Sequence, residues 1–430
     1  MLSKITSIFK IKELRKKILF VLMMFVFFRL MAAVPMPGIN ADNLTAFFDR
    51  FELVGFLSVL TGGALSQFSI IMLGIGPYIT SVIILQLLTM IFPALEKMYK
   101  EEGEAGKKKF NQYGRLLTIP LAFLQGYAML SWLQRPPDPV ISPPLDFVGM
   151  ITSLLTITAG TVLLMWIGEL ITEKGIGNGV SLIIFAGIVA SLPMSIFQAF
   201  QDISVDPTQI TGYGMFAVLA IVIIWAVVLI TEGRRNIPIS YAKRVRGNKM
   251  YGGVSTYLPM NINPAGVIPI IFALSILLLP EMIANFLGGA GGWVGSAATA
   301  VALFMANSWI RGILYFLFVV LFTYFYTAVT FDPKSISENL QKMGGFVPGI
   351  RPGEQTAKFI KYILNRVLLV GAMFLGLIAV MPSIVGGLTG VQDSFGFLVG
   401  GTSVLIVVSV VLETMKQINS QLQMRDYDTF

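Results

Sequence analysis

Residues whose side chains commonly do chemistry are scarce in this sequence. It contains no histidine and no cysteine, which excludes histidine-dependent general base catalysis, histidine- or thiolate-ligated metals and disulfide bonds. No pair of carboxylates lies inside an apolar segment, so a proton- or sodium-coupled relay has no evident carrier. The sequence therefore argues against an enzyme, and we expect no catalytic residue, no bound metal and no cofactor.

The sequence offers instead a regular spacing of bulky apolar side chains. Isoleucines recur every four residues, which places them on one face of a helix, at Ile71, Ile75, Ile79 and Ile83. Val180 and Ile184 repeat this spacing directly after the sequence GIGNG. The simplest interpretation is an ordinary packing or lipid-facing surface. Helix-breaking residues lie nearby, namely Gly74, Gly76, Pro77, Pro264 and Pro269. They favour the interpretation that the stripe lines a cavity, because broken helices at membrane depth survive only inside protein or beside water.

The composition indicates an integral membrane protein. The chain is 55% hydrophobic and 13% charged, with a mean hydropathy of +0.78, whereas soluble domains carry about 25% charged residues. A membrane-spanning helix needs roughly 20 predominantly apolar residues. We identify ten apolar segments as spans, at residues 18–34, 70–92, 116–133, 148–167, 180–200, 213–230, 265–287, 309–330, 367–388 and 396–412.

The stretch at residues 55–65, GFLSVLTGGAL, is apolar but too short to cross a bilayer. It is also broken by Gly62 and Gly63. We therefore predict a re-entrant or buried segment, which the chain would need to enclose within protein.

The loops between the spans differ sharply in charge. Of the 31 lysines and arginines, 27 fall on one side of the predicted membrane. Three fall on the other side, at Arg50, Arg135 and Arg311, and Arg29 lies near the end of the first span. Because cytoplasmic loops carry the excess of basic residues, both termini are predicted to be cytoplasmic.

Two of the cytoplasmic loops are too long to be simple connectors. In the loop at 231–264, alternating segments at 237–245 and 250–258 flank Arg246-Gly247-Asn248-Lys249, which predicts a β-hairpin with a basic tip. The loop at 331–366 is rich in Gly and Pro around Arg351 and then becomes helical. Both loops are predicted to be docking surfaces for a cytosolic partner.

Longer motifs run in order through nearly the whole chain. They are MPGI at 36–39, TGGALS at 61–66, LGIGPYITSVIILQLL at 73–88, EGEAGKKK at 102–109, MWIGELITEKGIGNGVSLIIFAGIVA at 165–190, NPAGVIPIIFA at 263–273, GGFVPGIRPGEQTAKFI at 344–360 and GGTSVLIVV at 400–408. On these motifs the chain strongly resembles the SecY family, the channel-forming subunits of the bacterial Sec protein translocase.

The resemblance implies an all-α polytopic membrane protein whose ten transmembrane helices form two inverted five-helix halves, with a re-entrant plug and protruding cytoplasmic loops. The halves would be residues 18–205 and 206–412, between an amphipathic cytoplasmic segment at 1–17 and a cytoplasmic tail at 413–430. The plug would run from about 55 to 66 and include Gly55, Leu57, Leu60, Gly62, Gly63 and Leu65.

The resemblance also implies a set of functional residues. A ring of apolar side chains would close the pore, at Ile75, Ile79, Val180, Ile184, Ile271 and Ile406. A lateral gate between the second and seventh spans would have Thr80, Gln86 and Asn263 at or near it. The docking sites for the motor and the ribosome would include Arg244, Arg246, Lys249 and Arg351.

The function that the resemblance implies is that of a passive, gated channel in the bacterial plasma membrane. Such a channel passes unfolded preproteins across the membrane and releases membrane segments laterally into lipid. Its partners would be the SecE and SecG subunits, the SecA motor ATPase, the ribosome, signal sequences, nascent polypeptides and membrane lipids. The alternative is an ion-coupled secondary transporter, which is also built from inverted repeats with broken helices, but we find no substrate site or coupling carboxylates for it.

The topology can be tested by labelling single cysteines from each side of the membrane. We expect a cysteine at Asn248 to be labelled only from the cytoplasm and a cysteine at Gly291 only from the outside, because the basic loops stay cytoplasmic. Labelling of either position from the opposite side would contradict the ten-span topology.

Overall fold

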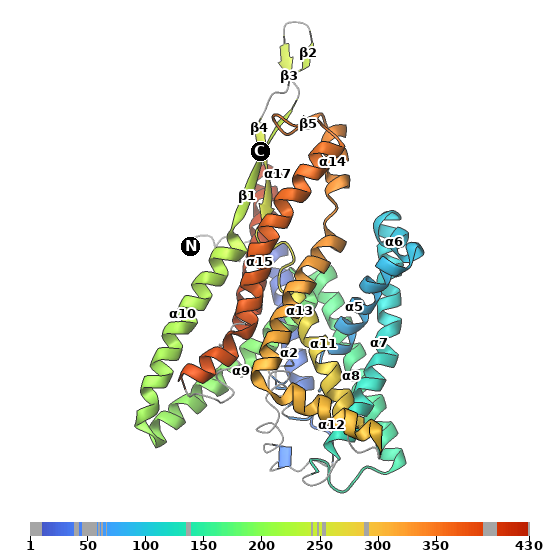
Figure 1. The fold of residues 1–430 in the computed structure, drawn as a ribbon, viewed down its shortest axis with the longest axis vertical. Helices are drawn as coiled ribbons and strands as arrows, with labels where there is room; N and C mark the ends of the chain where they lie inside the picture. Colours follow the sequence, from blue (N-terminus) through green and yellow to red (C-terminus); the bar gives the residue numbers. More distant parts are fainter. Residues whose placement is uncertain are drawn as a thin grey trace.

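The protein is an elongated bundle of helices with a small sheet projecting from one end (Figure 1). It is described here from a computed structural model. The structure describes residues 11–37, 43–44, 58, 61, 63–65, 67–134, 139–241, 244–246, 249–251, 255–287, 292–389 and 402–428.

Each of the ten predicted spans has a corresponding helix. These helices are α2 (Lys12–Ala32), α5 (Gly76–Ile91), α7 (Gly103–Leu133), α8 (Phe147–Lys174), α9 (Gly179–Val205), α10 (Ile210–Glu232), α11 (Ile268–Leu287), α13 (Ser308–Thr330), α15 (Glu354–Thr389) and α17 (Thr402–Asp428). Among the described residues, seven helices are long and apolar enough to cross a membrane, and eight are if one bent pair forms a single span. The predicted class, an all-α multi-pass membrane protein, is confirmed.

The second span differs from its prediction. Residues 70–75 form turns, and α5 begins only at Gly76, so Ile71 and Ile75 do not lie on the helix that carries Ile79 and Ile83. The predicted continuous stripe of four isoleucines is therefore wrong. Gly74 has a φ of 57°, a left-handed conformation that ends helical progression.

The other end of α5 is also interrupted. The helix turns by 112° at Phe92 into the short α6 (Pro93–Lys100). Pro93 opens α6, and a proline cannot supply the backbone N–H that a continuous helix needs.

Besides α6, three further short helices were not predicted. The 3-10 helix η1 (Pro207–Gln209) joins α9 to α10, and α14 (Pro333–Lys342) lies in the second long loop. The third, α12 (Trp293–Ala306), lies across the end of the bundle opposite to the sheet (Figure 1). With 14 residues, α12 is shorter than a span requires.

The predicted hairpin in the first long loop is confirmed, and it is longer than expected. Strand β1 (Arg234–Tyr241) pairs antiparallel with β4 (Ser255–Asn261), and β2 (Arg244–Arg246) pairs with β3 (Lys249–Tyr251). The pairing of Arg246 with Lys249 leaves two residues between the strands, as the Gly-Asn turn required.

The second long loop adds a third strand to this sheet. Strand β5 (Gly345–Phe346) pairs antiparallel with the end of β1, so the strand order is β4-β1-β5. A separate apolar cluster joins the same elements, and its buried members are Ile237, Ile239, Met260, Leu340, Val347, Ile360 and Leu364. The two long loops, which the sequence predicts to be cytoplasmic, therefore form one folded unit with α14 and the start of α15, and we call it the cytoplasmic unit.

Close packing of α8 against the turns before α5 depends on a glycine. A Cβ atom at Gly160 would overlap the carbonyl oxygen of Ile70, which is backbone and cannot rotate away. By contrast, a Cβ atom at Gly214 in α10 would meet no atom within 4 Å.

This difference gives a matched pair of substitutions. Gly160→Ala should destabilise the protein by about 1–3 kcal/mol through overpacking, whereas Gly214→Ala should be neutral or slightly stabilising because alanine favours helices. Thermal unfolding of both variants in detergent would measure the effect. Equal stability of the two variants would contradict the close approach of α8 to Ile70.

Candidate pore constriction, gate and docking surfaces

All six residues predicted to form the pore ring belong to one apolar cluster. Ile75, Ile184 and Ile406 are buried members, with 5%, 6% and 0% of their surface exposed. Ile79, Val180 and Ile271 are partly buried and pack against the same cluster. The same cluster extends over α2, α8, α10, α13 and α15, so it is the main core of the bundle, and the six predicted ring residues are part of this core.

Four separate helices supply these side chains. Ile75 is the N-cap residue of α5 and Ile79 lies in its first turn, while Val180 and Ile184 lie in the first two turns of α9. Ile271 lies near the start of α11, and Ile406 near the start of α17. The first-turn positions follow from the helix breakers, because Pro77 and the GIGNG turn start new helices beside these residues.

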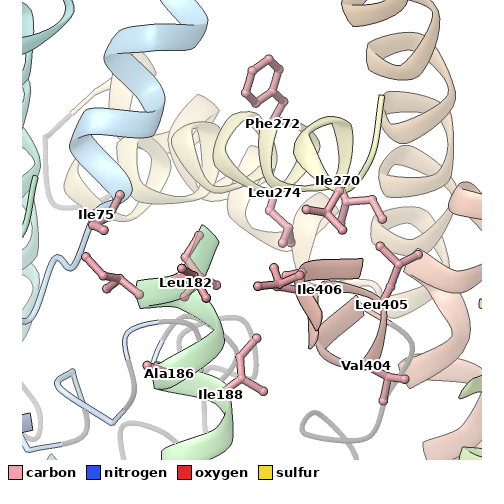
Figure 2. Close-up of a cluster of buried hydrophobic side chains, with 14 of the residues drawn as sticks. Ile75, Leu182, Ala186, Ile188, Ile270, Phe272, Leu274, Val404, Leu405 and Ile406 are labelled. Atoms are coloured by element: carbon pink, nitrogen blue, oxygen red, sulfur yellow. The ribbon is translucent and has the colours of Figure 1, made fainter. Parts of the chain in front are cut away.

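Figure 2 shows further side chains that sequence reasoning missed. Leu182 of α9 lies beside Ile406, and Ile270 approaches from α11 (Figure 2). Both are buried, with exposed fractions of 6% and 0%. Both residues lie in the same sequence motifs as the predicted ring residues. Those motifs do not distinguish side chains that line a pore from side chains that pack behind it, so the sequence pointed to them only weakly.

Most of the predicted plug lies outside the described residues, including Gly55, Leu57, Leu60 and Gly62. Of its described members, Leu65 is buried in a second cluster with Phe68 and Met72. The neighbouring Ala64 is fully buried in the same cluster as the ring residues, and its carbonyl accepts a 2.8 Å hydrogen bond from Ser69 N–H. Gly63 is partly buried, and its N–H donates to Ser58 O over 2.8 Å.

The three predicted lateral-gate residues are all buried, each with 8% of its surface exposed: Thr80, Gln86 and Asn263. Thr80 and Gln86 lie on α5, Asn263 lies five residues before the start of α11, and α5 contacts α11. The Thr80 hydroxyl donates to Gly76 O, and the Asn263 amide donates to Gly266 O. Within the described part of the chain, Gln86 Oε1 and Asn263 Oδ1 have no hydrogen-bond partner.

Unpaired buried oxygens are costly, at about 1–3 kcal/mol each. Gln86 lies on α5, whereas Asn263 lies beside α15, because a Cβ atom at Gly371 would meet Asn263 Cα at 3.8 Å.

The predicted docking residues lie on the cytoplasmic unit. Arg244 and Arg246 lie on β2 and Lys249 begins β3, at the far end of the hairpin (Figure 1). Arg351 is exposed in the loop between β5 and α15. The backbone of this loop is held in place, because Arg351 O accepts a 2.9 Å hydrogen bond from the Thr356 hydroxyl.

The connection between α9 and α10 is short and well capped. Asp206 Oδ1 accepts hydrogen bonds from the hydroxyl and the N–H of Thr208. These bonds, the hydroxyl first, hold the pKa of the Asp206 carboxyl below its ordinary value. The Tyr213 hydroxyl donates to Asp202 over 2.8 Å, which ties the start of α10 to the end of α9.

Comparison with known proteins places this arrangement in a family. The sequence model of the SecY family matches residues 69–415. The protein translocase subunit SecY of Streptomyces scabiei is 40% identical over 441 residues, which cover 100% of both chains. The chain therefore belongs to the SecY family, a family of protein-translocation channels.

Solved structures agree with this fold. A structure described as a protein conducting channel matches with a TM-score of 0.65 and 18% identity, covering 93% of this chain and 91% of the other. Sec61 in a canine ribosome-channel complex from the endoplasmic reticulum matches with a TM-score of 0.62, 18% identity and the same coverage. At such low identity these two matches support the fold alone.

Proposed function

We propose that this chain is the central protein-conducting channel of a bacterial Sec translocon. It passes unfolded preproteins across the plasma membrane and releases membrane segments laterally into lipid. The observation that carries the proposal is that six apolar side chains at breaks and starts of α5, α9, α11 and α17 all lie in or against the main apolar core. Membership of the SecY family favours this function over a secondary transporter.

An apolar constriction suits a channel for varied polypeptides. An ion that crosses it must lose water and gains no ligand in return, which costs several kcal/mol even after relaxation. Isoleucine and valine side chains offer no hydrogen bonds, so they can close around many sequences without binding any of them. A polar or charged ring would instead select ions. In this proposal Ile75, Ile79, Val180, Ile184, Ile271 and Ile406 form the seal.

The residues between Gly55 and Ser66 act as the plug in this proposal. Burial of Ala64 in the main apolar core supports this role, because the end of the segment is anchored in the same core as the ring residues. Withdrawal of the plug would then expose the ring to the outer side.

The boundary between α5 and α11 acts as the lateral gate. Its support is the contact between α5 and α11, together with the buried Gln86 of α5, whose Oε1 atom has no hydrogen-bond partner within the described residues. A signal sequence or membrane segment that parts the two helices would relieve the cost of burying this atom unpaired.

The cytoplasmic unit serves as the docking surface for translocation partners. Its support is the exposed Arg351 and the basic β2–β3 hairpin, which projects away from the bundle (Figure 1). The ribosome and the SecA motor would dock here. The SecE and SecG subunits would complete the membrane complex, with both termini of this chain in the cytoplasm.

The function can be tested in vesicles that contain the purified complex. We expect uptake of an unfolded preprotein that requires the added motor ATPase and ATP, and no uptake of small solutes driven by an ion gradient. Gradient-driven uptake of a small solute without preprotein uptake would indicate the transporter instead.

The seal predicts an ion leak when several ring residues become polar. Replacing Ile75, Ile79, Ile184 and Ile406 together by serine should raise the conductance of planar bilayers without substrate, because water and ions then enter the constriction. The control replaces four exposed isoleucines outside the cluster, namely Ile196, Ile221, Ile224 and Ile313. Equal conductance of the ring variant and the control would show that the seal lies elsewhere.

The docking role of Arg351 predicts a selective loss. Arg351→Glu should lower motor-driven preprotein uptake and motor affinity severalfold, because the charge reversal repels an acidic contact, while assembly of the channel stays intact. Lys361→Glu, at another exposed basic position of the same unit, is the control. Unchanged uptake by Arg351→Glu at limiting motor concentration would contradict the docking role.

A further inference from the structure

Two consecutive side chains of α17 bind two different parts of the protein. Lys416 Nζ forms a 2.7 Å ion pair with Glu232 Oε1 at the end of α10. Gln417 Oε1 accepts a 2.8 Å hydrogen bond from the backbone N–H of Gly177, in the turn between α8 and α9. One point of α17 is therefore tied both to the predicted N-terminal half and to the predicted C-terminal half.

The turn that receives Gln417 is tightly defined. Gly177 has a φ of 90°, which side chains rarely tolerate, and a Cβ atom there would lie 3.3 Å from Thr414 Oγ1 of α17. Gly179 N–H donates to Thr172 Oγ1 over 2.8 Å, and the Asn178 side chain caps α9 by accepting from Ser181 N–H. Because the turn cannot shift locally, a bond to Gly177 fixes the start of α9 itself.

Each partner of this bond lies on or next to a helix that carries ring residues. Gly177 lies in the turn before α9, three residues ahead of Val180. On the α17 side, Gln417 follows Ile406 by eleven residues, about three helical turns, so the two side chains lie on the same face of α17. One face of α17 carries Ile406, and the start of α9 carries Val180 and Ile184. The bond thus sets the position of this face of α17 relative to the start of α9.

Apolar contacts surround this polar bond. Ile176 from the turn, Ile418 from α17 and Leu14 from α2 form a separate buried cluster beside it. Their exposed fractions are 4%, 8% and 3%. The contact between α17 and the turn is consequently a packed interface with one directional hydrogen bond in it.

We propose that Gln417 is a positioning residue for the constriction, holding α9 and α17 in the register that closes the ring. This inference rests on the proposed function, since it assumes that the ring is the seal. The ion pair of Lys416 with Glu232 ties α17 to α10, so α17 moves with α10 when the bond to Gly177 breaks. A channel that opens by separating α9 from α17 must therefore break or lengthen this hydrogen bond.

The test compares substrate-free conductance of reconstituted channels that carry single substitutions. Gln417→Leu removes the acceptor at similar size and should raise the open fraction about two- to tenfold, the effect of losing one hydrogen bond. Gln417→Glu keeps an oxygen acceptor and should restore the conductance of the parent protein. Asn419→Leu, an exposed position two residues further along α17, is the matched control and should behave as the parent.

Several outcomes would overturn the inference. One is a conductance of Gln417→Leu equal to that of the parent protein. Another is a rise in the conductance of Asn419→Leu as large as that of Gln417→Leu. The third is a conductance of Gln417→Glu that stays as high as that of Gln417→Leu. If Gln417→Leu fails to assemble, Gln417→Asn replaces it, because the shorter side chain keeps the amide but cannot reach Gly177. Preprotein uptake by the parent and the leak of the multiply substituted ring are measured in parallel, so that a failure of the proposed channel function is recognised separately.

Discussion

The absence of water in the bilayer core constrains every other feature of this chain. Each backbone N–H and C=O at that depth must find a partner within the protein, so helices are the default and any break must be enclosed. The turns at residues 63–75 meet this requirement through hydrogen bonds of their own. Ile70 N–H donates to Val34 O over 3.1 Å, Met36 N–H donates to Phe68 O over 2.9 Å, and Gly74 N–H donates to Ile71 O over 2.8 Å. Because α8 approaches these turns at Gly160, they remain inside the bundle.

The enclosed break has a direct effect on the constriction. A continuous helix through residues 70–92 would place Ile71, Ile75, Ile79 and Ile83 along one straight face. The turns instead place Ile75 at the end of the non-helical stretch and Ile79 in the first turn of the helix that begins at Gly76, and both residues still belong to or pack against the main apolar core.

Much of this architecture could be predicted from the sequence, for identifiable reasons. Span positions follow from hydropathy, because each must fill the hydrocarbon layer, and the β2–β3 turn follows from the Gly-Asn pair between Arg246 and Lys249. The predicted start of α5 was wrong, because the four-residue spacing of the isoleucines continues through Gly74 and does not show that this glycine is left-handed and interrupts the helix. Strand β5 has only two residues, and its pairing with β1 is set by tertiary packing that no local signal encodes. The bond from Gly177 to Gln417 joins residues 240 positions apart and rests on a side chain that is unremarkable in sequence.

Strand β5 gives the cytoplasmic unit a mechanical property. The sheet is connected to α10 through β1, to α11 through β4 and to α15 through β5, so load applied to the hairpin spreads to three helices at once. The β1–β4 ladder runs from Arg234–Asn261 at the bundle to Ser240–Ser255 toward the tip, so a force along the hairpin axis pulls both strands in the same direction and leaves the ladder's hydrogen bonds unsheared. The covalent backbones of β1 and β4 therefore carry such a force directly into the ends of α10 and α11.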